Sequence, residues 1–273
     1  MITCNFFGGL GNNLFQLATV YSIHKKFGYE MSIPSITSRP GADRINQSSK
    51  LELMDLFENE FQYNDELEGL TQYVNSDTHL VEYSYTPTPN TDNTCYFGYF
   101  QSEKYFLGVD VAKDFVVKSE NIKAIESMYG DCFNKKTISL HYRLGGDRPS
   151  QHMQNYHKNV SIDFYKKALE LVKYNPEEYN ILVFTDNIPL CEQLLETLGH
   201  EFTIIDNDNN NILDFTFMSL CDVNIVGNST FAWWAAYVNK KDNMVIVTED
   251  EWFGPGYSHF NLKDVFPEKW VKI

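Results

Sequence analysis

Small hydroxyl residues stand where an apolar strand meets an apolar helix late in the chain. The strand pattern covers Val223 to Gly227, and Asn228, Ser229, Thr230 and Phe231 follow it directly. The first backbone N–H groups of a helix have no partner within the helix and lie at the positive end of its dipole, so they attract anions. The hydroxyl groups of Ser229 and Thr230 add side-chain donors. This pattern predicts a phosphate-binding site at 228–231.

A second candidate group is the segment HYRLGGD at 141–147. Arg143 ends a predicted strand and precedes Leu144 and two glycines, which allow the backbone to approach a ligand closely. Its guanidinium could bind two phosphate oxygens at once, or form a salt bridge with a carboxylate between domains. His141 lies on the same side of the strand, because strand side chains alternate. It is either a ligand-binding residue or a buried, hydrogen-bonded histidine.

Aspartates near strand ends are candidates for acid–base or orienting roles. Asp147 follows the glycine turn, where it could act as a general base, orient Arg143 or cap the loop. Asp186 ends another predicted strand and either faces the ligand or caps the next helix. Asp206 and Asp208 form an Asp-x-Asp pair, which is typical of metal-dependent sugar transferases. They lie in an asparagine-rich stretch without a further acidic ligand nearby, so we expect a loop and no metal ion.

A glycine turn near the start, GGLGNN at 8–13, contains Gly9, Gly11 and Asn12. Its spacing fits neither GxGxxG nor GxxxxGK[ST], so it predicts neither a dinucleotide fold nor a phosphate loop. Taken alone, it indicates a tight turn between a strand and a helix, without a ligand.

The order of elements from residue 137 onward predicts an α/β fold. Strand patterns at 137–143, 180–186, 202–206, 223–227 and 244–248 alternate with helix patterns at 161–173, 189–198, 212–220 and 231–239. Such alternation predicts a parallel sheet with ligands beyond the carboxyl ends of its strands. Trp233 and Trp234 are expected to pack in the core, with sugar stacking as the alternative.

The first half of the chain is less regular. A strand at 2–6 and a helix after the glycine turn are predicted, then a short helix at 51–57, a strand at 79–83 and an amphipathic helix at 120–129. We place a domain boundary near Asn134, which gives domains at 1–133 and 134–273.

Composition excludes several classes of protein. A formal net charge of -15 opposes binding to nucleic acid or to anionic lipid. Apolar runs are shorter than the ~20 residues of a membrane span, and the first residues lack a secretory signal, so we expect a cytoplasmic protein. The five cysteines are scattered singly, which favours reduced, structural thiols over disulfides or zinc ligands.

Three ordered segments resemble one family. GGLGNNLFQ at 8–16, HYRLGGD at 141–147 and NSTFAWW at 228–234 are similar to the motifs of the alpha-1,2-fucosyltransferases, glycosyltransferase family 11. GYFQSEKYF at 98–106 and MSLCDVNIVGNSTFAWW at 218–234 also resemble family segments. The resemblance implies a GT-B-like fold of two Rossmann-type domains, with the nucleotide-sugar site in the C-terminal half. It also implies an inverting, metal-independent transfer of L-fucose from GDP-fucose to a glycan acceptor, alpha-1,2 to galactose, without a cofactor.

The same resemblance implies roles for single residues. Arg143 would hold the beta-phosphate, His141 and Asp186 would approach the nucleoside, and Asn12 would lie near the fucose and the acceptor hydroxyl. The donor-binding set would also include the following residues: Gly9, Gly11, Asn228, Ser229, Thr230 and Phe231. Arg143, Asp147 and Asn12 are the expected catalytic residues.

One departure from the family pattern concerns the central motif. The family has two consecutive arginines, whereas Leu144 follows Arg143 here, as in the His-x-Arg-x-Gly-x-Asp pattern of protein O-fucosyltransferases. Transfer of another nucleotide-linked sugar, or binding of a sugar or nucleotide without catalysis, are therefore the alternative functions.

Overall fold

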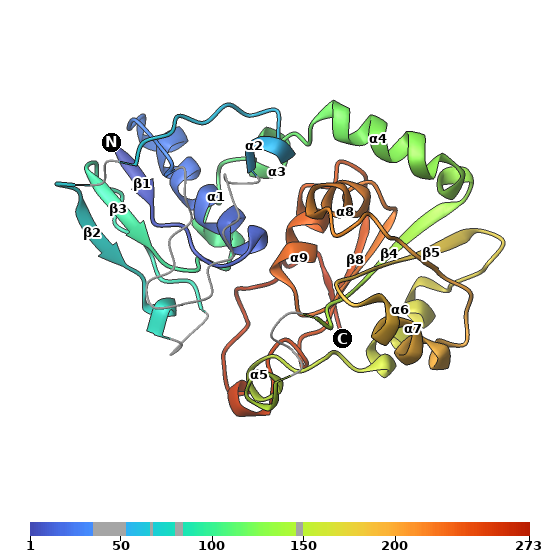
Figure 1. Cartoon of the computed structure of the whole chain (residues 1–273). Helices are drawn as coiled ribbons and strands as arrows, with labels where there is room; N and C mark the ends of the chain where they lie inside the picture. The colour runs from blue at the N-terminus through green and yellow to red at the C-terminus, as the bar shows by residue number, and fades with distance from the viewer. Residues whose placement is uncertain (35–52, 66–67, 80–83, 146–149) are drawn as a thin grey trace. The chain divides into compact units, whose positions relative to one another are not determined.

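The computed structural model describes residues 1–34, 53–65, 68–79, 84–145 and 150–273. The chain divides into two compact units (Figure 1). Unit 1 comprises Met1–Lys118 and Asn261–Glu268, and unit 2 comprises Ser119–Phe260 and Lys269–Ile273. The sequence pattern placed the boundary near Asn134, but the helix that begins at Ser119 packs with unit 2.

A three-stranded parallel sheet lies at the centre of unit 1. Its strands in spatial order are β1 (Ile2–Cys4), β3 (Thr94–Phe97) and β2 (Thr71–Val74). Helix α1 (Leu10–Phe27) follows β1 after the glycine turn, and its apolar side chains from Leu10 to Ile23 are mostly buried, whereas Phe27 at its end is exposed. The sequence pattern predicts β1 and α1 but neither β2 nor β3, because four residues show too little alternation to be recognised.

The other helical elements described in unit 1 are short. They are α2 (Leu53–Leu56), α3 (Val111–Asp114) and the 3-10 turns Ser76–His79 and Glu103–Tyr105. Helix α2 confirms the short helix expected at 51–57. The strand expected at 79–83 is not seen at its first residue, because His79 ends a 3-10 turn, and 80–83 lie outside the described residues.

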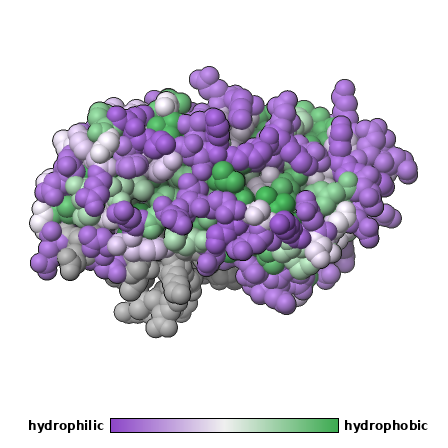
Figure 2. Space-filling model, turned by 90° about the horizontal axis from the view of Figure 1, so that it is seen from above, coloured by the Kyte–Doolittle hydropathy of each residue, from purple (hydrophilic) through white to green (hydrophobic). Residues whose placement is uncertain are grey.

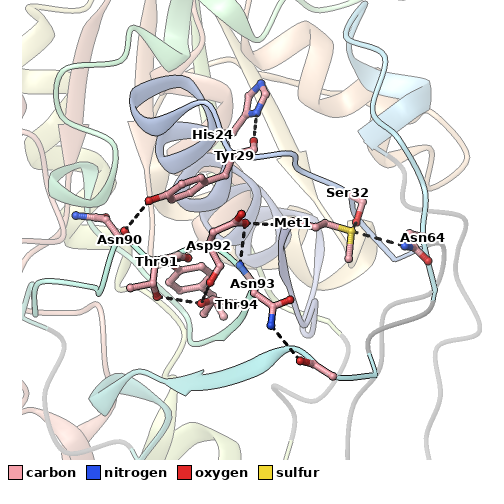
Figure 3. A network of polar contacts seen from close by, with 12 residues as sticks. Met1, His24, Tyr29, Ser32, Asn64, Asn90, Thr91, Asp92, Asn93 and Thr94 are labelled. Carbon is pink, nitrogen blue, oxygen red and sulfur yellow. Dashed lines mark hydrogen bonds and ion pairs between the residues drawn. The ribbon is translucent and has the colours of Figure 1, made fainter.

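Polar contacts fasten the edge of this sheet around the first residue (Figure 3). The amino group of Met1 lies 2.6 Å from Asp92 Oδ1, and the hydroxyl of Ser32 lies 3.0 Å from the Met1 sulfur. His24 Nδ1 lies 2.7 Å from the carbonyl oxygen of Tyr29, at the end of α1. The start of β1, the end of α1 and the turn before β3 are thus joined.

Unit 2 contains a six-stranded parallel sheet in the order β6-β5-β4-β7-β8-β9. The bounds of its strands are β4 (Lys136–Tyr142), β5 (Tyr179–Thr185), β6 (Thr203–Ile204), β7 (Val223–Val226), β8 (Met244–Val247) and β9 (Val271–Lys272). In the register of the sheet, His141 pairs with Phe184 on one side and with Val226 on the other. The carboxyl ends of β4, β5 and β7 therefore lie side by side. The sequence pattern predicts β4 to β8, and the structure confirms all five of them. It does not predict β9.

Helices cover both faces of this sheet (Figure 1). Helices α6 (Ile162–Val172) and α7 (Ile188–Leu195) pack on the face that carries Leu140 and Val183. Helices α8 (Asn211–Met218) and α9 (Thr230–Tyr237) lie on the opposite face, where Phe217 contacts Phe184. Unit 2 also contains α4 (Ser119–Tyr129), α5 (Gln151–Tyr156) and the 3-10 turns Gly130–Asn134, Glu196–Leu198 and Pro255–Tyr257.

Core and surface follow the sequence expectations. Trp233 and Trp234 are fully buried within α9, which confirms their place in the core. The face shown in Figure 2 is mainly hydrophilic, in keeping with a chain whose net charge is -15. Among the described residues, none of the helices has the length and apolar character needed to cross a membrane.

Candidate functional site

Helix α9 begins at the carboxyl edge of the unit 2 sheet, shortly after β7 ends. Ser229 is its N-cap residue, but the buried Ser229 side chain makes no capping hydrogen bond. The backbone N–H groups of the first turn are therefore not covered by that hydroxyl, and they point along the helix axis. The next two residues, Thr230 and Phe231, are partly exposed. The strand-to-helix turn expected at 228–231 is thus present, and phosphate binding by this turn stays a prediction.

The side chain of Asn228 braces this turn. It is buried, and its Nδ2 donates to the carbonyl oxygens of Lys158 at 2.8 Å and Glu251 at 3.1 Å. The Glu251 carboxylate accepts hydrogen bonds from the N–H and the hydroxyl of Ser161, just before α6. Asn228 thus connects two loops to the start of α9 by hydrogen bonds. Its side-chain NH2 group therefore has a structural role in this turn.

His141 is held beside the start of α9. Its carbonyl oxygen accepts a 2.9 Å hydrogen bond from the Tyr165 hydroxyl, and a Cβ on Gly227 would lie only 3.1 Å from the same oxygen. The His141 ring lies 6.0 Å from the ring of Phe231. The side chain is 9% exposed. A buried histidine packed against the first turn of α9 agrees with both roles considered from the sequence.

Asp186 joins the carboxyl ends of β4 and β5. Its Oδ1 accepts hydrogen bonds from the backbone N–H groups of Leu144 and Gly145, both at 2.7 Å. Its Oδ2 lies 4.0 Å from Arg143 Nε. The alternative role as a helix cap is wrong, because Asn187 accepts the capping hydrogen bond from Leu190 N–H.

Arg143 lies one residue beyond β4, and its side chain is 45% exposed. Its acidic neighbour, Asp186, is 41% exposed and belongs to the same unit. At 4.0 Å the two groups attract each other without a hydrogen bond, and exposure to water weakens that attraction to about 1 kcal/mol or less. The guanidinium is exposed at this edge of the sheet, where an anionic ligand could reach it.

A carboxylate that the sequence reasoning missed lies at the start of α8. Asp214 Oδ1 accepts a 2.8 Å hydrogen bond from Asn207 Nδ2, and burial raises the pKa of Asp214 to about 6. Asp206 and Asp208 lie in the adjacent turn, where Asp206 Oδ1 accepts from the N–H of Asp208, as expected for a loop. An acidic residue in the first turn of a helix after a strand end is the signal that could have identified Asp214. A perturbed carboxyl at this edge is a candidate site residue.

The glycine turn of unit 1 positions Asn12. Gly8 has a φ of 83°, and a Cβ there would lie 2.5 Å from Asn12 Nδ2, so only glycine fits under this side chain. Gly9 is the N-cap of α1, and a Cβ on it would meet nothing within 4 Å. Gly11 is buried in the first turn of the helix. The turn is tight and leaves space over Gly9.

Two further polar residues of the same motif are buried and hold the turn. Asn13 Nδ2 donates to the carbonyl oxygen of Phe7, and Gln16 Nε2 donates to the carbonyl oxygens of Phe7 and Gly98. The N–H of Phe7 donates to Gln16 Oε1 in return. The asparagine and glutamine of the GGLGNNLFQ motif thus have structural roles, which the sequence reasoning did not identify.

The predicted residues fall into separate groups. Unit 2 brings together His141, Arg143, Asp186 and 228–231 along one sheet edge, whereas Gly9, Gly11 and Asn12 belong to unit 1. Asp147 lies outside the described residues. Within the described ranges, His, Cys, Asp and Glu side chains form no group of three suited to a metal ion.

The model of the family Glycosyl transferase family 11 matches residues 1–273, so the chain belongs to this family. This match confirms the family that the three motifs indicate.

Two curated relatives come from Escherichia coli. O-antigen biosynthesis glycosyltransferase WbnK is 25% identical over 66% of this chain and 60% of its own length. An alpha-1,2-colitosyltransferase is 26% identical over 65% of this chain and 62% of its own length. The chain thus spans about three fifths of the curated relatives it matches.

Among solved structures, the chain is similar to the fucosyltransferase NodZ from Bradyrhizobium. The NodZ crystal soaked with GDP-fucose superimposes with a TM-score of 0.54 at 13% identity, over 93% of this chain and 96% of NodZ. The parallel sheets and this likeness confirm the expected GT-B-like α/β fold.

Proposed function

We propose that this protein is an inverting glycosyltransferase that moves L-fucose from GDP-fucose to a glycan hydroxyl, alpha-1,2 to galactose. Membership of glycosyl transferase family 11 supports a transferase, and the name of a relative that forms an alpha-1,2 linkage supports the linkage. The GDP-fucose soaked into NodZ supports the donor.

One observation supports the proposed donor-binding site. The exposed guanidinium of Arg143 follows β4, and the start of α9 follows β7, the neighbouring strand in the sheet. His141 connects them, because it belongs to β4 and packs its ring against Phe231. A planar guanidinium and the N–H groups of a first helical turn, on the same edge of a sheet, can together bind the oxygens of a diphosphate.

The groups at this edge of the sheet can stabilise the negative charge that develops in the reaction. The anomeric C–O bond breaks, positive charge develops on the sugar ring and negative charge develops on the departing GDP. Donors fixed in place stabilise that charge without reorganising, which is the term expected to dominate catalysis. Arg143 and the first turn of α9 supply such donors, so the proposed transfer needs no metal ion.

The acceptor hydroxyl loses a proton as it bonds to the anomeric carbon. We assign Asp147 as the general base that takes this proton, since its carboxylate follows the Arg143 loop in the sequence. Asn12, held over Gly8 at the start of α1, would donate a hydrogen bond to the sugar or the acceptor.

A second donor is supported by one comparison. The name of one relative specifies colitose, a sugar that is fucose without its 3-hydroxyl group. The experiment is a screen of GDP-fucose, GDP-colitose, UDP-galactose and TDP-rhamnose with lactose, in which mass spectrometry identifies the product. A fucosyl-lactose product supports the proposal, a colitosyl product supports the second donor, and a product from UDP- or TDP-sugars only would contradict both.

Two controls separate catalysis from binding and from metal chemistry. GDP release should require the acceptor and should fall by about 10²- to 10³-fold in Arg143→Ala, whereas a binding protein without catalysis would release none. Activity should persist in excess chelator, and its loss would identify a metal-dependent transferase.

A further inference from the structure

We propose that the buried carboxylate of Asp77 is a positioning residue for the acceptor step, which it affects through the turn at 99–101 and the contact of Gln101 with Asn12. This inference rests on the proposed function in one respect, that Asn12 donates a hydrogen bond to the sugar or the acceptor. It gives a role in the reaction to a carboxylate that the proposed mechanism does not use.

The carboxylate of Asp77 is bonded to the backbone of that turn. Asp77 belongs to the 3-10 turn Ser76–His79 and is 3% exposed. Its Oδ1 accepts a 3.1 Å hydrogen bond from the N–H of Tyr99, and its Oδ2 accepts a 2.7 Å hydrogen bond from the N–H of Phe100. A buried carboxylate is costly unless such hydrogen bonds satisfy it. Both of its oxygens therefore hold the chain at 99–100.

The backbone that Asp77 holds has an unfavourable conformation. Phe100 has a φ of 53°, in the left-handed region that residues other than glycine seldom adopt. Its ring is fully buried and lies 5.1 Å from the ring of Tyr105. Hydrogen bonds to an ionised group are about twice as strong as those between neutral groups, so the carboxylate stabilises this conformation. The φ of Phe100 sets the direction in which the chain continues to Gln101.

The side chain of Gln101 then orients the amide of Asn12. Gln101 Nε2 donates a 3.0 Å hydrogen bond to Asn12 Oδ1. An asparagine amide has an acceptor end and a donor end, and the hydrogen bond from Gln101 engages the acceptor end. The donor end lies over the glycine turn, where a Cβ on Gly8 would be 2.5 Å from Asn12 Nδ2. Gln101 thus selects the orientation in which Asn12 presents a donor, as the proposed function requires.

The experiment compares acceptor kinetics with GDP binding in the full chain. In Asp77→Asn, an NH2 group replaces one acceptor oxygen and meets a backbone N–H, so the turn should shift. At saturating GDP-fucose, kcat/KM for lactose should fall by about 10-fold. The dissociation constant for GDP, measured by calorimetry, should stay within about 2-fold of the wild type, because the proposed diphosphate site belongs to unit 2. Rates are measured at about pH 8, where Asp77 is ionised, since burial raises its pKa to about 6.

A second background separates positioning from a general loss of structure. In Gln101→Leu, the residue through which Asp77 acts no longer holds Asn12. Asp77→Asn should then reduce kcat/KM for lactose by less than about 2-fold more. A role in the structure alone would give the same further loss in both backgrounds.

Two control variants of unit 1 leave the turn untouched. Asp110 is exposed and caps α3 by accepting from the N–H of Lys113, so Asp110→Asn makes the same change of charge and keeps a capping side chain. Ile33 is fully buried, so Ile33→Val lowers stability by removing one methyl group. Both variants should keep kcat/KM for lactose within about 2-fold of the wild type. Circular dichroism checks folding, and Asp77→Ser, which places no NH2 group in the turn, replaces Asp77→Asn if that variant does not fold.

Three results would overturn the assignment. Unchanged kcat/KM for lactose in Asp77→Asn would show that the carboxylate does not affect the acceptor step. An equal loss of GDP affinity, or a full further loss in the Gln101→Leu background, would show that Asp77 does not act through Asn12. If the wild type transfers no sugar, the proposed function itself fails and this inference falls with it.

Discussion

Gln101 Nε2 donates a 3.0 Å hydrogen bond to Asn12 Oδ1, which joins the turn after β3 to the start of α1. The two residues are 89 positions apart and belong to two separate segments of family resemblance, GGLGNNLFQ and GYFQSEKYF. Gln101 is nearly buried, at 9% exposure. Its amide orients the Asn12 side chain, so these distant motifs form one structural unit.

Gln101→Leu should therefore lower kcat/KM for the acceptor by about 10-fold, because it removes a buried hydrogen bond that orients Asn12. The affinity for GDP should change less than about 2-fold, since the proposed diphosphate site belongs to unit 2. Initial rates at varied acceptor concentration and calorimetry with GDP measure the two effects. In an Asn12→Ala background, Gln101→Leu should add little. Gln193→Leu, at an exposed position of α7, is the control, and equal losses in both backgrounds would contradict the coupling.

Asp77 supports the turn that carries Gln101, and it gives unit 1 a dependence on pH. Its Oδ1 and Oδ2 accept from the N–H groups of Tyr99 and Phe100, and Phe100 has a φ of 53°. Burial raises the pKa of Asp77 from 3.8 to about 6. Between these values the folded state binds more protons than the unfolded state, so the unfolding free energy should fall as the pH rises and should level off above about pH 6.

Urea unfolding of the wild type and of Asp77→Asn, from about pH 4 to about pH 7, isolates this contribution. The unfolding free energy of the wild type minus that of the variant should decline with rising pH, by at most about 3 kcal/mol. The amide in the variant does not titrate, so parallel curves for the two proteins would show that Asp77 has an ordinary pKa in the folded state.

The sequence predicts the unit 2 sheet well because its strands are apolar and alternate with recognisable helices. β4 and β5 have seven residues each, and α6 carries a clear apolar face, so periodicity suffices there. β2 and β3 have four residues each, and the residues of β2 are mostly exposed, so local pattern cannot distinguish them from loops. β3 pairs with β1 on one side and with β2 on the other, and these long-range contacts are encoded by no local signal.

For the candidate site, too, the sequence predicts some features and not others. The sequence locates Arg143 and the start of α9 because Arg143 ends one predicted strand and the start of α9 follows another. It does not decide which of Asp186 and Asn187 caps α7, because that choice depends on the N–H groups of Leu144 and Gly145, in the turn after β4. Contacts between elements, not local preference, assign such polar side chains.

Arg143→Ala should lower kcat by about 10²- to 10³-fold, the loss expected when one donor to a developing oxyanion is removed. Arg143→Lys keeps the charge but not the planar fork, so it should recover only part of this loss. Steady-state rates with GDP-fucose measure both variants. A lysine variant with full activity would show that the site needs charge alone.

Asp147→Asn tests the proposed general base. The amide accepts no proton, so kcat should fall by about 10²- to 10⁴-fold, and the acid limb of the pH profile of kcat/KM should flatten. Rates at saturating donor across the pH range measure this. Asp131→Asn, at an exposed position of unit 2, should leave the profile unchanged. A normal profile in Asp147→Asn would assign the acid limb to another group.

Gly145→Ala should destabilise unit 2 by about 1–3 kcal/mol, because the new Cβ would lie 2.8 Å from the carbonyl oxygen of Asp186. Gly130→Ala is the matched control, since a Cβ there meets nothing within 4 Å and should change the unfolding free energy by less than about 0.5 kcal/mol. Urea unfolding compares the two. The shortest contact is with backbone, so adding Asp186→Ala to Gly145→Ala should not restore stability. Recovery in the double variant would instead place the conflict in the carboxylate at 3.1 Å.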